Sequence, residues 1–128
     1  MDFSTLLAVR DLMSKEMVTT DDTATVIEMA KTMAERNVSS VVIVNHGDGR
    51  VVGIVTEADV VRKGVATGLD LGATAASAIM NTQVQKVDGG ASIFDARDTM
   101  KKAGVRHMIV EEEGKPVGII SSTALLGS

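Results

Sequence analysis

Apolar residues along the chain follow first a helical and then a strand-like periodicity. Five of them recur at the three- and four-residue spacing of an amphipathic helix: Val26, Ile27, Ala30, Met33 and Ala34. The run "VSSVVIV" at 38–44 is rich in β-branched residues, which is typical of a strand buried on both faces. The turn residues "NHGDGR" at 45–50 precede a second apolar run, "VVGIV" at 51–55, and so predict a hairpin. A further helix is predicted to start within "TEADVVRKGVA" at 56–66.

The same pattern returns 67 residues later. Met13 then falls on Met80, Ala24 on Ala91, and a second helical set appears: Ile93, Phe94, Ala96, Met100 and Ala103. The second hairpin turn is two residues shorter, so "VVGIVT" at 51–56 falls on "PVGIIS" at 116–121 with an offset of 65. Thr23 or Thr25 is predicted to cap the first of these helices and Ser92 the second. The chain is therefore an internal duplication.

Each copy is predicted to contain a short strand, a helix, a strand, a hairpin turn, a strand and a helix. We divide the chain into repeat 1 at 7–66, a Gly-rich linker at 67–76 and repeat 2 at 77–128. One copy alone leaves too much of its apolar sheet uncovered, so we expect one compact module with pseudo-two-fold symmetry. The predicted class is α+β (mixed α/β), with a three-stranded sheet and two helices in each repeat.

Composition excludes several functions. A net charge of −4, with two Phe and neither Trp nor Tyr, argues against a nucleic-acid binder, which needs a basic face or aromatic stacking platforms. The absence of Cys removes disulfides and thiolate metal sites, and we expect no metal. No apolar run is long enough to span a membrane, and "MDFSTLLAVRD" does not have the basic start of a secretory signal. We therefore expect a cytoplasmic protein.

Both repeats resemble the CBS domain, the cystathionine-β-synthase type regulatory module. The resemblance rests on "LMSKEMVTT", "ATVIEMAKTMAERNVSSVVIV" and "GRVVGIVTEADVV" in repeat 1, and on "IMNTQVQKV", "ASIFDARDTMKKAGVRHMIV" and "GKPVGIISSTALL" in repeat 2. It covers nearly the whole chain. It implies clefts between the two copies that often bind an adenosine compound, and frequent pairing of two modules into a dimer.

Thr56 and Asp59 in "GIVTEAD" have two interpretations. They form a capping box, or they bind a ligand, with backbone N–H groups and the Thr56 hydroxyl on a phosphate and the Asp59 carboxylate on a ribose diol. Repeat 2 keeps the hydroxyl as Ser121 and replaces the acid with Ala124, so the helix start there does without a carboxylate. This difference favours a ligand role for Asp59. In the CBS domain family, which this chain resembles, the Asp that matches Asp59 binds ribose and the Thr that matches Thr56 contacts phosphate.

Arg106 and His107 precede the second long strand, where repeat 1 has Ser39 and Ser40. They are a solvated basic pair, or they neutralise the phosphates of a ligand. The resemblance implies that they would do so at the cleft that contains Asp59. The resemblance implies a base pocket from residues that also read as ordinary core: Met13, Met17, Val18, Val38 and Ser39. A second, weaker cleft would have Ser121 but no acid.

Together with these residues, the resemblance implies a regulatory module, without catalytic residues, that senses AMP, ADP or ATP and acts on an unidentified partner protein or within a homodimer. Two alternatives stay open. The module is a ligand-free dimerisation or interaction domain, or its ligand is another adenosyl compound such as S-adenosylmethionine. Arg106 and His107 weigh against the latter, because that ligand is cationic and has no phosphates.

Overall fold

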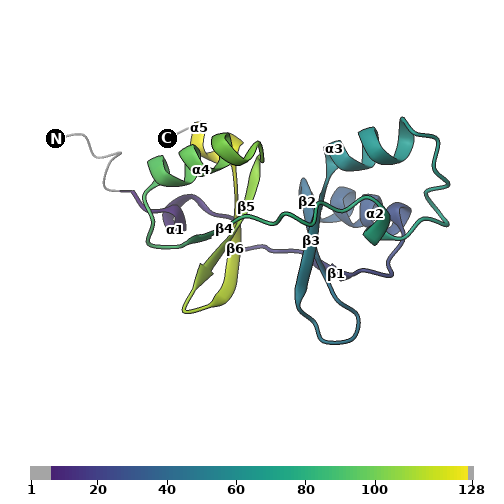
Figure 1. Ribbon diagram of the computed structural model, residues 1–128, viewed down its shortest axis with the longest axis horizontal. Coiled ribbons are helices and arrows are strands. Elements are labelled where there is room, and N and C mark those ends of the chain that lie inside the picture. The colour runs from purple at the N-terminus through teal and green to yellow at the C-terminus, as the bar shows by residue number, and fades with distance from the viewer. Residues whose placement is uncertain (1–6, 127–128) are drawn as a thin grey trace. The chain divides into compact units, whose positions relative to one another are not determined.

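The computed structural model describes residues 7–126, and its elements repeat in the order that the duplication predicts (Figure 1). The chain divides into two compact units, and each is described on its own. The middle unit contains residues 18–84, and the terminal unit contains residues 7–17 together with 85–126. No helix in the described part of the chain is long and apolar enough to cross a membrane.

The middle unit is built on a three-stranded sheet. Its strands β1 (Thr19–Asp21), β2 (Ser40–Val44) and β3 (Val51–Thr56) lie in that order, with β1 parallel and β3 antiparallel to β2. Helix α2 (Val26–Arg36) connects the parallel pair, as such a crossover requires. After β3, helix α3 (Glu57–Asp59) continues directly into the π-helix η2 (Val60–Val65), and a 3₁₀ turn, η3 (Ala76–Ala78), follows.

The terminal unit repeats this arrangement. Strands β4 (Lys86–Asp88), β5 (His107–Glu112) and β6 (Lys115–Ser121) form its sheet, again with one parallel and one antiparallel pair. Helix α4 (Ile93–Ala103) connects β4 to β5, and α5 (Ser122–Leu126) follows β6. The short helix α1 (Val9–Leu12) completes the unit. The predicted α+β class with two three-stranded sheets is confirmed.

The connecting helices begin at capping residues that the sequence predicted. The hydroxyl of Thr25, and not that of Thr23, accepts a hydrogen bond from the Glu28 N–H at 3.2 Å and caps α2. Ser92 caps α4 by accepting from the Asp95 N–H at 3.1 Å. Both helices end on a left-handed residue, Asn37 with φ 54° and Gly104 with φ 69°. The glycine takes this conformation without steric cost.

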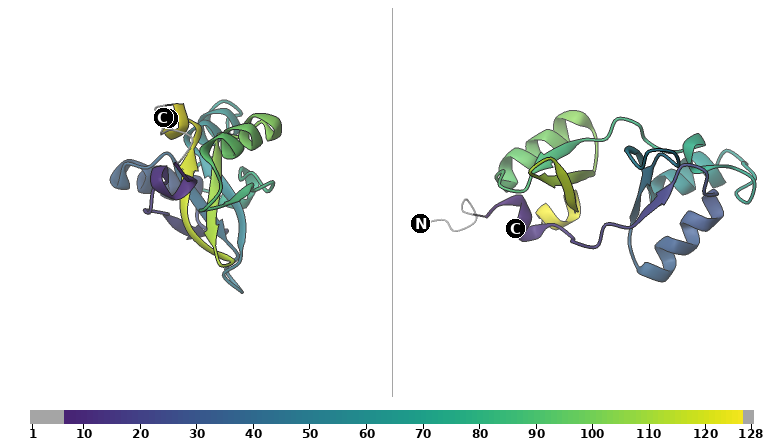
Figure 2. Two further views of the ribbon diagram at one scale, coloured as in Figure 1. Left: turned by 90° about the vertical axis from the view of Figure 1, so that its left-hand side faces the viewer. Right: turned by 90° about the horizontal axis from the view of Figure 1, so that it is seen from below.

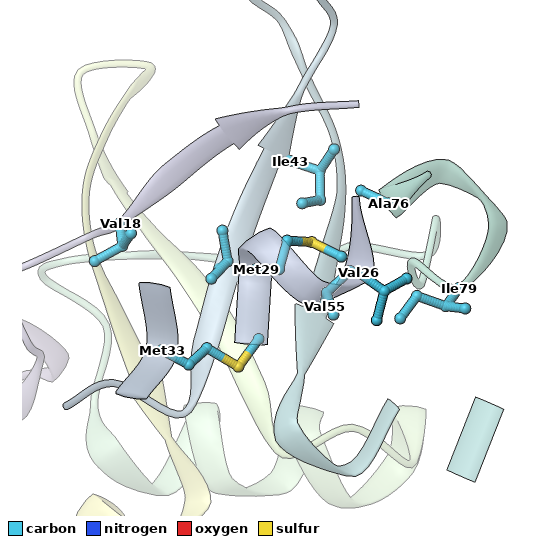
Figure 3. Packing of buried hydrophobic residues seen from close by; sticks show 9 residues of the cluster. Val18, Val26, Met29, Met33, Ile43, Val55, Ala76 and Ile79 are labelled. Atoms are coloured by element: carbon cyan, nitrogen blue, oxygen red, sulfur yellow. The ribbon is translucent and has the colours of Figure 1, made fainter. Parts of the chain in front are cut away.

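Each sheet packs one face against its own helices. In the middle unit, Val26, Met29 and Met33 of α2 contact the sheet, and Figure 3 shows this cluster with Ala76 and Ile79 of the η3 segment. Figure 2 shows α2 lying along one side of the strands. The terminal unit has a matching cluster formed by α1, α4, α5 and the sheet, and the Arg97 guanidinium there donates to the Leu125 carbonyl at 2.7 Å. The helical periodicity of the sequence thus marks the core only in part: Val26 and Met33 lie in it, whereas Ile27, Ala34, Phe94 and Ala103 of the predicted sets are exposed.

The start of each repeat packs on the sheet of the other repeat. Ser14 exchanges backbone hydrogen bonds with Ile119 of β6, at 2.8 and 3.0 Å, while Asn81 exchanges them with Ile54 of β3, at 2.9 and 3.1 Å. This reciprocal exchange explains why residues 7–17 belong to the unit that contains repeat 2. The compact units in space therefore cut across the repeats in the sequence.

The segment expected as a linker, residues 67–76, is tied to the first turn of α2. The Val26 N–H donates to the Thr74 carbonyl at 2.9 Å, and the Ile27 N–H donates to the Leu71 carbonyl at 3.0 Å. The Ala76 N–H returns a bond to the Ala24 carbonyl at 2.7 Å. These bonds satisfy amides at the start of α2 that have no partner inside the helix.

Candidate functional site

The turn from β3 into α3 holds Thr56 and Asp59 in a capping box. Oδ2 of Asp59 accepts the Thr56 N–H at 2.9 Å and the Thr56 hydroxyl at 3.1 Å, while the Thr56 Oγ1 accepts the Asp59 N–H at 3.2 Å. The Thr56 hydroxyl proton therefore points to Asp59, and donation to a phosphate would require it to rotate. The capping interpretation is confirmed. It involves one carboxylate oxygen and does not exclude a ligand role for the other.

The second carboxylate oxygen of Asp59 faces Lys63. Lys63 Nζ lies 3.2 Å from Asp59 Oδ1 and also donates to the Ile79 carbonyl at 3.3 Å. The Asp59 side chain is 16% exposed and that of Lys63 is 49% exposed, so the pair lies at the border between the interior and solvent. The sequence interpretation omitted Lys63. Its spacing of four residues after Asp59 is the available signal, because such residues face each other on a helix.

Three other predicted site residues lie at the same end of this sheet. Ser39 precedes β2, and its carbonyl accepts the Glu57 N–H at 3.1 Å, which ties the start of β2 to the start of α3. Val38 packs against the core of the unit. Val18, 8% exposed, precedes β1, and its carbonyl accepts the Val42 N–H at 2.9 Å. The middle unit thus brings Val18, Val38, Ser39, Thr56 and Asp59 to one sheet end.

The remaining predicted residues belong to the terminal unit, where the same turn is built from different side chains. The Ser122 N–H donates to the Arg106 carbonyl at 2.8 Å, as Glu57 does to Ser39, and His107 lies opposite Ser121 in the sheet. Ser121 Oγ accepts the Ala124 N–H at 3.3 Å. Arg106 is exposed and His107 is half-buried. Repeat 2 therefore keeps the hydroxyl cap without the carboxylate.

The two methionines of the predicted base pocket also lie in the terminal unit. Met13 is half-buried and packs against the core there. A Cβ on Gly118 would come within 2.8 Å of the Met13 sulfur, so the glycine makes room for this side chain. Met17 is half-buried, in the segment that leads from Ser14 to β1. The ordinary-core interpretation of Met13 is thus supported by its packing, and a ligand role for either methionine remains a prediction.

A hydrogen-bonded His–Asp pair lies elsewhere in the middle unit, at the hairpin turn after β2. Nδ1 of His46 is 2.8 Å from Asp22 Oδ1, and this hydrogen bond with the charge of Asp22 raises the pKa of His46. Thr23 lowers the pKa of Asp21 by hydrogen bonding to its carboxylate. Within residues 7–126, no three His, Asp or Glu side chains are grouped closely enough to hold a metal ion.

Comparisons with known proteins agree with the fold and the duplication. The family model of the CBS domain matches residues 9–66 and again 76–128. An uncharacterised protein of Methanopyrus kandleri is 33% identical over 121 residues, which is 94% of this chain but 61% of that protein. The chain thus spans about three fifths of that relative.

Two solved structures show how far the fold likeness extends. An uncharacterised conserved protein from Pyrococcus horikoshii superimposes with a TM-score of 0.86 at 28% identity, over 99% of this chain and 93% of the other. The hexameric CBS-CP12 protein from bloom-forming cyanobacteria has a TM-score of 0.86 at 26% identity, over 94% of this chain and 69% of the other. The likeness therefore covers both units.

Proposed function

The chain belongs to the CBS domain family, and from that premise we propose that this CBS pair is a regulatory module that senses an adenine nucleotide: AMP, ADP or ATP. CBS domain pairs are generally regulatory modules. The proposal assigns the chain ligand binding and no catalysis. The ligand would favour one arrangement of the module over another, and a partner protein or a second copy would respond to that change.

One observation carries the proposal. The capping box uses Oδ2 of Asp59 alone, so Oδ1 of this partly buried carboxylate is not needed by the cap; it ion-pairs with the half-exposed Lys63 and lies at the end of the sheet that carries Ser39 and Thr56. A carboxylate oxygen in such a place is a strong acceptor for a ribose hydroxyl, because a hydrogen bond to a charged group is stronger than one between neutral groups. Repeat 2 has Ala124 there and provides no such oxygen.

The residues proposed for the phosphates and for adenine are those that the sequence analysis named. Arg106 and His107 are the cations that would neutralise phosphates, and the fork of the guanidinium suits two phosphate oxygens at once. Adenine would be held by apolar side chains and backbone groups around five residues: Met13, Met17, Val18, Val38 and Ser39. Because the acid is missing from repeat 2, we expect one dominant nucleotide per chain and at most a weak site at Ser121.

A second candidate function, an interaction module, is favoured by exposed apolar side chains on the helices. Ile27 of α2 is 37% exposed and Phe94 of α4 is 45% exposed, and the two occupy equivalent positions in the repeats. Val61 and Val65 of η2 are each 58% exposed. Together with the hexameric CBS-CP12 neighbour, these residues support self-association, and we propose a homodimer. Light scattering should give twice the chain mass of 13.4 kDa, and Phe94→Ser should lower the measured mass toward that of one chain.

Thermal unfolding with added ligands tests the proposed sensing role. AMP, ADP and ATP should raise the melting temperature, since a ligand at a hundred times its dissociation constant adds about 2.7 kcal/mol to the stability of the folded state. S-adenosylmethionine should raise it less, because it has no phosphates for Arg106. If none of the nucleotides shifts the transition while the protein still self-associates, the interaction module is the better account.

A further inference from the structure

The Asp59 carboxylate has few acceptor positions left for a ligand. An ionised carboxylate offers about four lone-pair positions, two on each oxygen. Thr56 fills both positions on Oδ2 with its N–H and its hydroxyl, at 2.9 and 3.1 Å. The Lys63 ammonium lies 3.2 Å from Oδ1 in an ion pair and so occupies the space on one side of that oxygen. Counting only partners within residues 7–126, one side of Oδ1 is left open.

Lys63 is held in this position from a second side. Its ammonium also donates to the carbonyl of Ile79, a residue that is 1% exposed. Two residues further on, Asn81 pairs with Ile54 of β3 through two backbone hydrogen bonds, so the segment that carries this carbonyl is fixed to the sheet. Withdrawal of Lys63 from Asp59 would therefore break the contact with Ile79 as well.

We propose that Lys63 limits Asp59 to one ribose hydroxyl and so determines how the module distinguishes ribose from deoxyribose. This inference rests on the proposed function. A ribose diol offers two O–H donors, and the single open position on Oδ1 accepts one of them. The second hydroxyl would need the position that Lys63 occupies. Lys63 touches the carboxylate and acts through it, so it is a specificity-determining positioning residue.

Deoxy analogues test this directly. Titration calorimetry measures the affinities of AMP, 2′-deoxy-AMP and 3′-deoxy-AMP for the wild type and for Lys63→Met. If ATP gives the larger melting shift, ATP and its two deoxy analogues are used instead. In the wild type, loss of one hydroxyl should weaken binding about tenfold or more, and loss of the other less than about twofold. In Lys63→Met both losses should weaken binding, because two positions on Oδ1 are open.

Two further variants separate this effect from a general loss of charge. Lys63→Arg keeps a cationic donor beside Oδ1 and should restore the wild-type pattern. Lys102→Met removes a lysine that pairs with Asp98 at 2.9 Å with the same four-residue spacing, in α4 of the terminal unit. It should leave the pattern unchanged.

The outcomes are distinguishable. If both deoxy analogues bind the wild type equally poorly, or if Lys63→Met discriminates as the wild type does, the role of Lys63 is wrong and nucleotide binding stands. If Lys102→Met changes the pattern as Lys63→Met does, the effect is one of net charge and the inference is again overturned. If neither AMP nor ATP binds the wild type, the proposed function fails, and this inference fails with it.

Discussion

Gly53 of β3 packs closely against the Met80 side chain, and the two residues occupy the same places in the middle unit as Gly118 and Met13 in the terminal unit. A Cβ on Gly53 would lie 2.7 Å from the Met80 sulfur and 3.0 Å from the Asn81 carbonyl oxygen. On Gly118 it would lie 2.6 Å from the Ser14 carbonyl oxygen. The glycine repeated in "VVGIV" and "PVGII" therefore gives room for the segment that each repeat donates to the sheet of the other.

Gly53→Ala should destabilise the protein, because the new methyl group forces Met80 and the backbone at Asn81 to move. Overpacking of this kind costs about 1–3 kcal/mol, which should appear as a lower urea midpoint. Gly72→Ala is the matched control, since a Cβ there would meet only Asp70 Oδ1 at an ordinary 3.6 Å. Equal midpoints for Gly53→Ala and the wild type would show that the donated segment does not press on β3.

The His46–Asp22 pair should make stability depend on pH. Asp22 raises the pKa of His46, so the folded protein holds the imidazole proton more tightly than the unfolded chain does. The pair therefore contributes its full stabilisation below the ordinary pKa of 6.5 and loses it as the pH rises through the raised value. The difference in unfolding free energy between the wild type and His46→Gln should thus be larger at about pH 5.5 than at about pH 8. A difference that stays constant with pH would contradict this.

Arg106→Ala should weaken binding of AMP and ATP through the phosphates alone. Loss of a hydrogen bond between charged groups costs about 1.5–3 kcal/mol, or about ten- to a hundredfold in affinity. Adenosine, which has no phosphate, should bind the variant as it binds the wild type. Arg50→Ala, in the exposed turn after β2, controls for the change in net charge. If adenosine loses as much affinity as ATP, Arg106 does not act on phosphate.

Much of the fold could be predicted because its signals are local. Helical spacing located α2 and α4, Ser92 was identified as a cap by its type and position, and the duplication doubled the evidence for each element. The exchange of the segments around Ser14 and Asn81 could not be predicted in this way. Each of these segments meets its sheet through a single bridged residue pair, which leaves no periodicity in the sequence.

The candidate site could be predicted in part because the duplication allows its residues to be compared between the two repeats. Comparison of Asp59 with Ala124 drew attention to the carboxylate, but the comparison alone left capping and ligand binding open. The assignment of Oδ2 to the cap and of Oδ1 to Lys63 depends on side-chain rotamers and on the position of the Ile79 carbonyl, which comes from a segment 16 residues beyond Lys63. Contacts of this length are set by tertiary packing.

Titration calorimetry of AMP and ATP with the wild type and with Asp59→Asn tests the central claim most directly. Asn keeps a carbonyl oxygen for the cap and should cost less stability than the roughly 1 kcal/mol expected for loss of a cap. The account predicts one nucleotide bound per wild-type chain and about ten- to a hundredfold weaker binding by Asp59→Asn, with little change in the unliganded melting temperature. Two equally tight sites per chain, or unchanged affinity in Asp59→Asn, would contradict it.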